Sequence, residues 1–70
     1  MMPLTFVNEG EKISIKQING RDETKRFLGS LGFVVGEDIV IISKIKGNLI
    51  VDVKDTRVAI DSQMASKILV

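Results

Sequence analysis

Apolar and polar residues alternate along several short segments, and this pattern restricts the fold more than any other feature of the chain. In the segment 12–18, Ile13 and Ile15 alternate with the polar residues Ser14 and Lys16. A period of two residues is typical of a β-strand with one buried face. Similar patterns recur in the segments 38–46, 49–54, 58–60 and 66–70. The chain is therefore predicted to be mainly β, with five short strands joined by tight turns, one of them a hairpin turn at Gly47–Asn48.

One segment, 22–31, has a helical period instead. Its apolar stripe occupies the positions i, i+3, i+4 and i+7, namely Thr24, Phe27, Leu28 and Leu31. This spacing predicts a short amphipathic helix, with Asp22 as its N-cap. Gly32 follows the last residue of the stripe and is suited to the left-handed conformation that ends a helix, with Phe33 packing back on Leu28.

The order of these elements predicts a small five-stranded SH3-like barrel with one short helix inserted after the first long strand. Curling the strands into a barrel removes most of their exposed edges. The alternative is an open α+β sheet. We expect residues 1–70 to form a single domain with the following core: Ile13, Ile15, Leu28, Leu31, Phe33, Ile39, Ile41, Val51, Ile60 and Ile68. In the segment 38–46, Ile39, Ile41 and Ile45 are predicted to share one face with Ser43. Val40 and Ile42 lie on the other face, which indicates that the first half of this segment is buried on both faces.

The sequence contains no Cys and no His, and this absence argues against most catalytic and metal-binding roles. No imidazole is present to activate a serine, so an enzyme is not expected. The acids Asp52, Asp55 and Asp61 do not match the spacing of a metal-binding loop, and we interpret Asp55 as a turn residue and Asp61 as a cap. Gly29 and Gly32 lie at a helix C-terminus, where a phosphate is not bound. No catalytic residue, metal ligand or cofactor is predicted.

Charge and hydropathy disfavour two further classes of partner. The net charge is +1, and the basic residues are spread among the acids. A nucleic-acid surface needs clustered positive charge, so no nucleic-acid partner is expected. The longest apolar run, 39–42, is far too short to span a bilayer, and the first residues do not resemble a signal peptide. We therefore expect a cytoplasmic protein that is not embedded in a membrane.

The segment 26–39, Arg-Phe-Leu-Gly-Ser-Leu-Gly-Phe-Val-Val-Gly-Glu-Asp-Ile, resembles the FeoA family. The flanking segments Gly10–Lys12, Ile18–Gly20 and Val58–Ile60, together with the C-terminal residues 65–70, fit the same pattern. The resemblance implies an accessory protein for ferrous-iron uptake that binds the cytosolic part of FeoB, a membrane transporter with a GTP-binding domain. It supplies no agreed catalytic or metal-binding residue.

Two positions depart from the family pattern. Val35 stands where the family usually has proline before the turn glycine, and Asp55 stands where glycine is common in a hairpin. Asp tolerates the left-handed conformation better than most residues, so we expect this turn to form. Two alternative functions stay open. One is an adaptor or regulatory domain similar to the C-terminal domain of iron-dependent repressors, and the other is an RNA- or ribosome-binding barrel.

The turn after the predicted helix is the candidate partner-binding site. Phe33, Val34 and Val35 are consecutive apolar residues between Gly32 and Gly36. A tight turn cannot direct three consecutive side chains into one core, so Val34 or Val35 should be exposed if Phe33 points inward. Exposed apolar residues are candidate anchors for a protein partner.

Two basic residues of the helix, Lys25 and Arg26, are predicted to add charge at the rim of this site. The alternative is that Val34 and Val35 are ordinary surface residues, or that they pack under Leu4 and Phe6.

Overall fold

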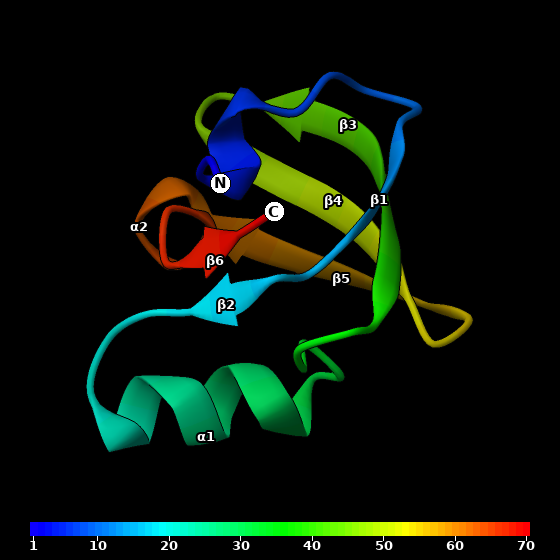
Figure 1. Ribbon diagram of the computed structural model, residues 1–70. Coiled ribbons are helices and arrows are strands. Elements are labelled where there is room, and N and C mark those ends of the chain that lie inside the picture. The colour runs from blue at the N-terminus through cyan, green and yellow to red at the C-terminus, as the bar shows by residue number, and fades with distance from the viewer.

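The computed structural model describes residues 1–70 and contains two antiparallel sheets (Figure 1). The larger sheet has the order β1-β3-β4-β5, with the strands Lys12–Ser14, Asp38–Ile45, Asn48–Val53 and Thr56–Asp61. The smaller sheet pairs β2 (Gln17–Ile18) with β6 (Ile68–Leu69). The helical elements are η1 (Leu4–Phe6), α1 (Asp22–Ser30) and α2 (Ser62–Ala65). Helix α1 lies at the opposite end of the molecule from η1.

The structure divides the segment 12–18, which the sequence predicts as one strand, into two strands in different sheets. β1 pairs with β3, whereas β2 pairs with β6. Between them, the backbone N–H of Ile15 donates to the carbonyl of Glu37, and that of Lys16 donates to the carbonyl of Leu69. The chain therefore crosses from one sheet to the other at these two residues. This crossing gives six strands, and the prediction of five was wrong in that respect.

The core is one cluster of fourteen buried apolar residues. It contains eight of the ten predicted core residues: Ile15, Leu28, Phe33, Ile39, Ile41, Val51, Ile60 and Ile68. Ile13 and Leu31 are only half-buried and pack against its edge. The prediction did not include the remaining members, which are Leu4, Val7, Leu49, Val53, Ala65 and Val70. Most of these come from the two chain ends, which pack together through the Pro3–Leu69 bridge.

A β-bulge at Ile42 changes which residues of β3 face the core. Ile41 pairs with Val51, but Ser43 pairs with Ile50, so Ile42 is an extra residue in the ladder. An extra residue reverses the alternation beyond it. Ile45 is therefore 55% exposed. The prediction that Ile45 shares a face with Ile39 and Ile41 was wrong for this reason. Val40 and Ile42 are half-buried and not fully buried on the second face as predicted.

Helix α1 has a narrower buried face than its sequence predicts. Leu28 is its only buried residue, whereas Phe27 is 49% exposed. Phe27 lies about 100° around the helix from Leu28 because successive residues turn by that angle. The N-cap is Arg21, with no side-chain hydrogen bond, and Asp22 is the first helical residue. The predicted N-cap was thus misplaced by one residue, although Asp22 still lies where a negative charge is favourable.

The C-terminus of α1 ends as predicted. Gly32 has φ of 104°, and its N–H donates to the carbonyl of Gly29. The N–H of Phe33 donates to the carbonyl of Leu28 over 3.0 Å, and both side chains are buried. These two bonds and the apolar contact define a Schellman motif. The motif turns the chain from α1 into the segment that carries the candidate site.

Both β-hairpins of the larger sheet have two-residue loops. Lys46 and Gly47 connect β3 to β4, and Lys54 and Asp55 connect β4 to β5. All four residues have positive φ, as the type I′ turn requires. The first loop begins one residue earlier than the predicted Gly47–Asn48 turn. The left-handed conformation predicted for Asp55 is confirmed, with φ of 62°.

Candidate functional site

The segment from Val34 to Glu37 forms a tight turn that is fixed to the neighbouring strand. The N–H of Glu37 donates to the carbonyl of Val34 over 3.1 Å, which closes the turn. Gly36 occupies its third position with φ of 92°, as in a type II turn. The N–H of Gly36 donates to the carbonyl of Ile15, and the N–H of Ile15 donates to the carbonyl of Glu37. The turn is therefore held by backbone bonds on both sides of Gly36.

The side chains of this turn divide between the core and the surface, as the sequence predicts. Phe33 is only 1% exposed, whereas Val34 and Val35 are 40% and 64% exposed. The alternative in which the two valines pack under Leu4 and Phe6 does not hold. Leu4 is buried in the core, and η1 lies at the far end of the molecule from the connection between α1 and β3 (Figure 1).

The turn rests against the end of the β4–β5 hairpin. A Cβ atom at Gly32 would lie 3.2 Å from Cγ2 of Val53, so the backbone approaches β4 closely there. The Nζ of Lys54 lies 3.8 Å from Oε1 of Glu37, and the Lys54 side chain is 56% exposed. An ion pair this exposed contributes little to stability. The backbone hydrogen bonds to Ile15, and not this ion pair, hold the turn that carries Val34 and Val35.

Lys25 and Arg26 are exposed on α1, and neither forms a hydrogen bond or an ion pair with the turn. Arg26 lies about 200° around the helix from Leu28, on the side away from the core. The exposure of Phe27, also on α1, was not predicted from the sequence, because the helical spacing assigned this residue to the buried stripe. Thr24, Leu28 and Leu31 alone define a narrower stripe along the helix, and Phe27 lies at the edge of that stripe. This narrower stripe would have indicated that Phe27 is partly exposed.

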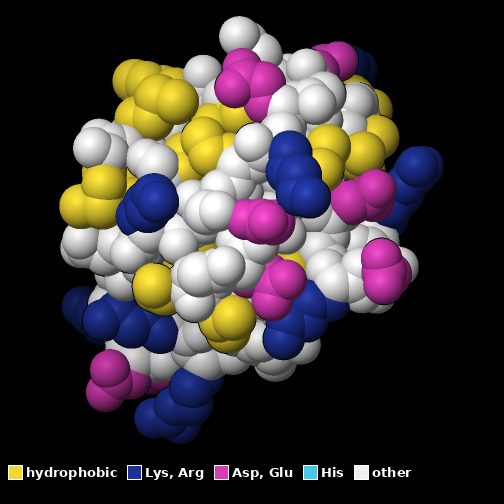
Figure 2. Space-filling model, turned by 45° about the vertical axis from the view of Figure 1, so that its right-hand side comes forward, with side chains coloured by type: hydrophobic (Ala, Val, Ile, Leu, Met, Phe, Trp, Pro, Cys, Tyr) yellow, Lys and Arg dark blue, Asp and Glu magenta, His cyan; other side chains and the backbone are white.

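Figure 2 shows a face on which apolar side chains gather in small patches between Lys, Arg, Asp and Glu side chains. Neither sign of charge dominates this face, in agreement with the net charge of +1. The large apolar residues that are exposed are Met1, Met2, Phe6, Phe27, Val34, Val35 and Ile45. Only Val34 and Val35 are consecutive members of a hydrogen-bonded turn.

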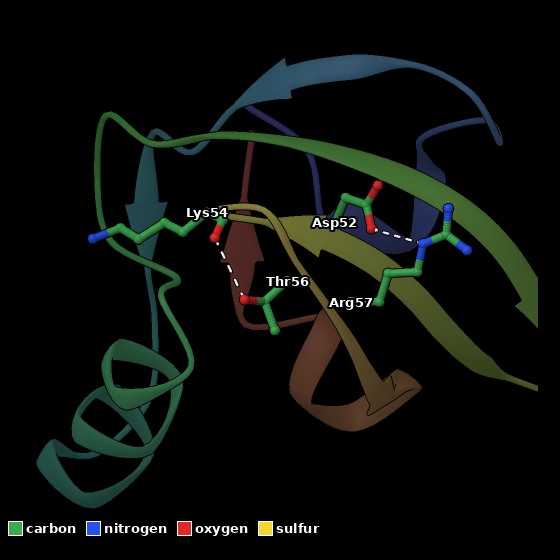
Figure 3. A network of polar contacts seen from close by, with 4 residues as sticks. All are labelled: Asp52, Lys54, Thr56 and Arg57. Atoms are coloured by element: carbon green, nitrogen blue, oxygen red, sulfur yellow. Dashed lines mark hydrogen bonds and ion pairs between the residues drawn. The ribbon is translucent and has the colours of Figure 1, made fainter.

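An open concavity of about 380 Å³ lies beside the β4–β5 hairpin. Its lining mixes acids and lysines: Lys12, Glu37, Asp38, Val40, Asp52, Lys54 and Asp55. Several carboxylates already have partners. Asp38 accepts from the hydroxyl of Ser14, and Asp52 accepts from Nε of Arg57 over 3.1 Å (Figure 3). No group of three or more acids is placed to hold a metal ion.

The three acids singled out in the sequence do not converge on one site. Asp61 accepts from the N–H of Met64 over 2.8 Å and caps α2, as predicted. Asp55 lies in the β4–β5 loop, also as predicted, and Asp52 is on β4. The glycines Gly29 and Gly32 lie at the C-terminal end of α1. Asp55, Asp61 and Gly32 therefore have structural roles in the fold, as a turn residue, a helix cap and a helix end.

Comparison with known proteins shows the family. The model of the FeoA domain matches residues 2–70. The chain belongs to the FeoA family. The Methanocaldococcus jannaschii protein named as an Fe(2+) transport protein A is 33% identical over all of this chain and 85% of its own length. The resemblance to the FeoA family that was based on the segment 26–39 is thus confirmed.

Solved structures show the same fold. A crystal structure of an iron uptake regulatory protein (FeoA) has a TM-score of 0.88 and 27% identity, over 96% of this chain and 89% of its own. The FeoA of Stenotrophomonas maltophilia, complexed with zinc and described as a procaryotic SH3 domain protein, has a TM-score of 0.84 and 25% identity, over 99% and 88%. The predicted SH3-like fold is therefore confirmed, with its strands arranged as two sheets.

A manganese-dependent transcriptional repressor has a similar fold at lower sequence identity. It has a TM-score of 0.86 and 17% identity, over 94% of this chain and 38% of the repressor chain. At this identity the likeness concerns the fold alone. None of the helices of the FeoA-family chain combines the length and the apolar character needed to cross a membrane.

Proposed function

We propose that this FeoA-family protein supports ferrous-iron uptake in the cytoplasm by binding the cytosolic part of a FeoB-like membrane GTPase transporter. Binding, and not catalysis, is the activity of the chain. The turn of Val34 and Val35 docks on the partner, and Lys25 and Arg26 on α1 add positive charge at the rim. The family, together with a relative named for Fe(2+) transport, supports the iron-uptake part of the proposal.

The observation that supports this docking site is the exposure of two apolar residues in a hydrogen-bonded turn. Val34 and Val35 are exposed, although the backbone on either side of Gly36 is hydrogen-bonded to Ile15. A preorganised apolar anchor loses little conformational entropy when it binds. A small group of buried apolar residues can then dominate the free energy of binding. Lys25 and Arg26 have no partner within the chain, so both cations are free to meet acidic groups.

Co-purification with the cytosolic domain of a FeoB-like transporter tests this proposal. The double change Val34→Glu with Val35→Lys places two charges in the turn and keeps the net charge. We expect it to abolish co-purification and to leave the thermal midpoint nearly unchanged, because both side chains are exposed. A matched control, Phe6→Glu with Ile45→Lys, charges two other exposed apolar residues and should leave co-purification intact.

Co-purification that survives the change in the turn places the interface elsewhere on the domain. Loss in the control but not in the turn variant assigns the interface to the surface of Phe6 and Ile45. The adaptor and RNA-binding alternatives have weaker support. The repressor likeness concerns fold alone, and the mixed charge of the surface does not favour a phosphate backbone.

A further inference from the structure

The strand β5 forms a long edge of the larger sheet that no other strand covers. It lies last in the order β1-β3-β4-β5, and its six residues pair with β4 without a bulge. The opposite edge strand, β1, has only three residues, and the strands of the smaller sheet have two each. Natural proteins protect long edges with bulges, prolines, charged side chains or a covering helix. β5 has no bulge and no proline, and its two charged residues, Arg57 and Asp61, have opposite signs.

The backbone groups that face outward from β5 follow from the turn before it. The two-residue loop of Lys54 and Asp55 makes Val53 and Thr56 a hydrogen-bonded pair. Hydrogen-bonded and non-hydrogen-bonded pairs then alternate along an antiparallel ladder. Arg57, Ala59 and Asp61 are therefore non-hydrogen-bonded with respect to β4. Their N–H groups point away from the sheet, and all three residues are exposed.

We propose that β5 pairs with β5 of a second copy of this chain, antiparallel and centred on Ala59, to form a symmetric dimer. In this register Ala59 faces Ala59 of the other copy, and their N–H and carbonyl groups form two hydrogen bonds. Arg57 of each copy faces Asp61 of the other. The N–H of Asp61 then donates to the carbonyl of Arg57 across the interface.

The charges of β5 are the reason for choosing a second copy as the partner. Arg57 and Asp61 lie two residues on either side of Ala59 and carry opposite charges. A two-fold axis through Ala59 therefore creates two opposite-charge pairs directly across the strands, an arrangement that stabilises antiparallel pairing. A strand of unrelated sequence would have to supply an acid and a base at the same spacing.

Both charged side chains keep groups free for this contact. Arg57 uses Nε on Asp52, and Figure 3 shows its terminal nitrogens turned away from that carboxylate. The Arg57 side chain is 69% exposed. Asp61 uses Oδ1 to cap α2, and its Oδ2 forms no hydrogen bond or ion pair within the fold. The existing contacts orient the two side chains and do not compete with the proposed pairs.

The apolar residues of β5 add to the same register. Val58 is half-buried and faces Ile60 of the other copy, as a non-hydrogen-bonded pair. Side chains of such pairs lie closest together across a ladder. The second copy thus covers the exposed part of Val58. The small side chain of Ala59 allows the two strands to approach at the two-fold axis.

Sedimentation equilibrium of the whole chain at low ionic strength tests the dimer. We expect a concentration-dependent dimer with a dissociation constant of about 1 mM or tighter. Arg57→Glu makes both cross-strand pairs repulsive and should weaken association about tenfold. The control Lys16→Glu changes the charge equally at an exposed residue outside β5 and should leave association unchanged. A wild-type chain that stays monomeric at about 1 mM overturns the proposal.

Mixing two variants separates a lost interface from lost folding. Asp61→Lys alone should also associate weakly, because it too creates like-charge pairs. An equimolar mixture of Arg57→Glu and Asp61→Lys restores opposite charges at every cross-strand position, so the mixture should form a heterodimer that neither variant forms with itself. Failure of the mixture to associate, while circular dichroism shows both variants folded, overturns the register.

A third variant tests the backbone bonds. Ala59→Pro removes an N–H that faces outward, a position at which an edge strand accepts proline. We expect it to abolish the dimer and to leave the circular dichroism spectrum of the monomer unchanged. Amide exchange should show that the N–H groups of Ala59 and Asp61 become protected as wild-type concentration rises. Unchanged exchange at Ala59 on dimerisation contradicts the proposal.

Discussion

The N–H of Gly36 donates a hydrogen bond of 2.8 Å to the carbonyl of Ile15, and this bond fixes the candidate docking turn to the core. Ile15 is the residue at which the chain crosses between the two sheets, and its side chain is 1% exposed. A surface feature is therefore attached to one of the most restrained points of the fold. The backbone that carries Val34 and Val35 is therefore already held in place in the isolated chain.

Replacing Val35 with proline should stabilise the protein. Val35 occupies the second position of a type II turn, where the fixed φ of proline fits, and its N–H forms no hydrogen bond. The change restricts the unfolded chain and should raise the free energy of unfolding by about 0.4–1 kcal/mol. Urea denaturation measures this difference. A lower free energy of unfolding would show that the turn cannot accept the proline ring.

The two glycines of the segment 29–32 should respond to alanine in opposite directions. Gly32 has φ of 104°, and a new Cβ would lie 3.2 Å from Val53. Gly32→Ala should therefore lower the free energy of unfolding by about 1–3 kcal/mol. Gly29 is helical, and nothing lies within 4 Å of its added Cβ, so Gly29→Ala should raise it by about 0.5–1 kcal/mol. Equal effects of the two changes in urea denaturation would contradict the assigned roles.

Truncation of Phe33 should severely destabilise the domain. Phe33 is the largest fully buried side chain, and it packs at the end of α1 next to Leu28. Phe33→Ala should cost about 3–5 kcal/mol, which is a large fraction of the stability of a small domain. The thermal midpoint measured by circular dichroism tests this. A midpoint close to that of the wild type would mean that Phe33 contributes little to the core.

Folding should not depend on a metal ion. The core consists of apolar side chains, and Asp52 and Asp61 are engaged with Arg57 and with the cap of α2. The thermal midpoint and the circular dichroism spectrum should be the same with and without a chelator. Tight, stoichiometric binding of ferrous iron or zinc by calorimetry would show that the acids act together as ligands.

The alternation of residues predicts most of the sheet, and it fails where tertiary pairing decides the structure. The β-bulge at Ile42 reverses the facing of the residues after it, and no residue in the pattern marks that position. The division of the segment 12–18 depends on its pairing partners, β3 and β6, which lie far along the chain. Both features arise from tertiary pairing and not from local periodicity.

The candidate site was more predictable because its constraint is local. Three consecutive apolar residues between two turn glycines cannot all be buried, and Val34 and Val35 are indeed exposed. The exposure of Phe27 was not predicted, since helical spacing identifies a stripe but not the width of the face that the sheet covers. The free edge of β5 could not be predicted from the sequence pattern either, because it depends on the order of the strands in the sheet.

Direct titration of the protein into a purified cytosolic domain of a FeoB-like transporter is the most direct test of the central claim, that the turn of Val34 and Val35 is the docking site. We expect saturable binding that Val34→Glu with Val35→Lys weakens by about 2 kcal/mol or more, roughly thirtyfold. The control variant, Phe6→Glu with Ile45→Lys, should bind like the wild type. Equal affinities of the wild type and the turn variant, with both proteins folded, would show that Val34 and Val35 do not form the docking site.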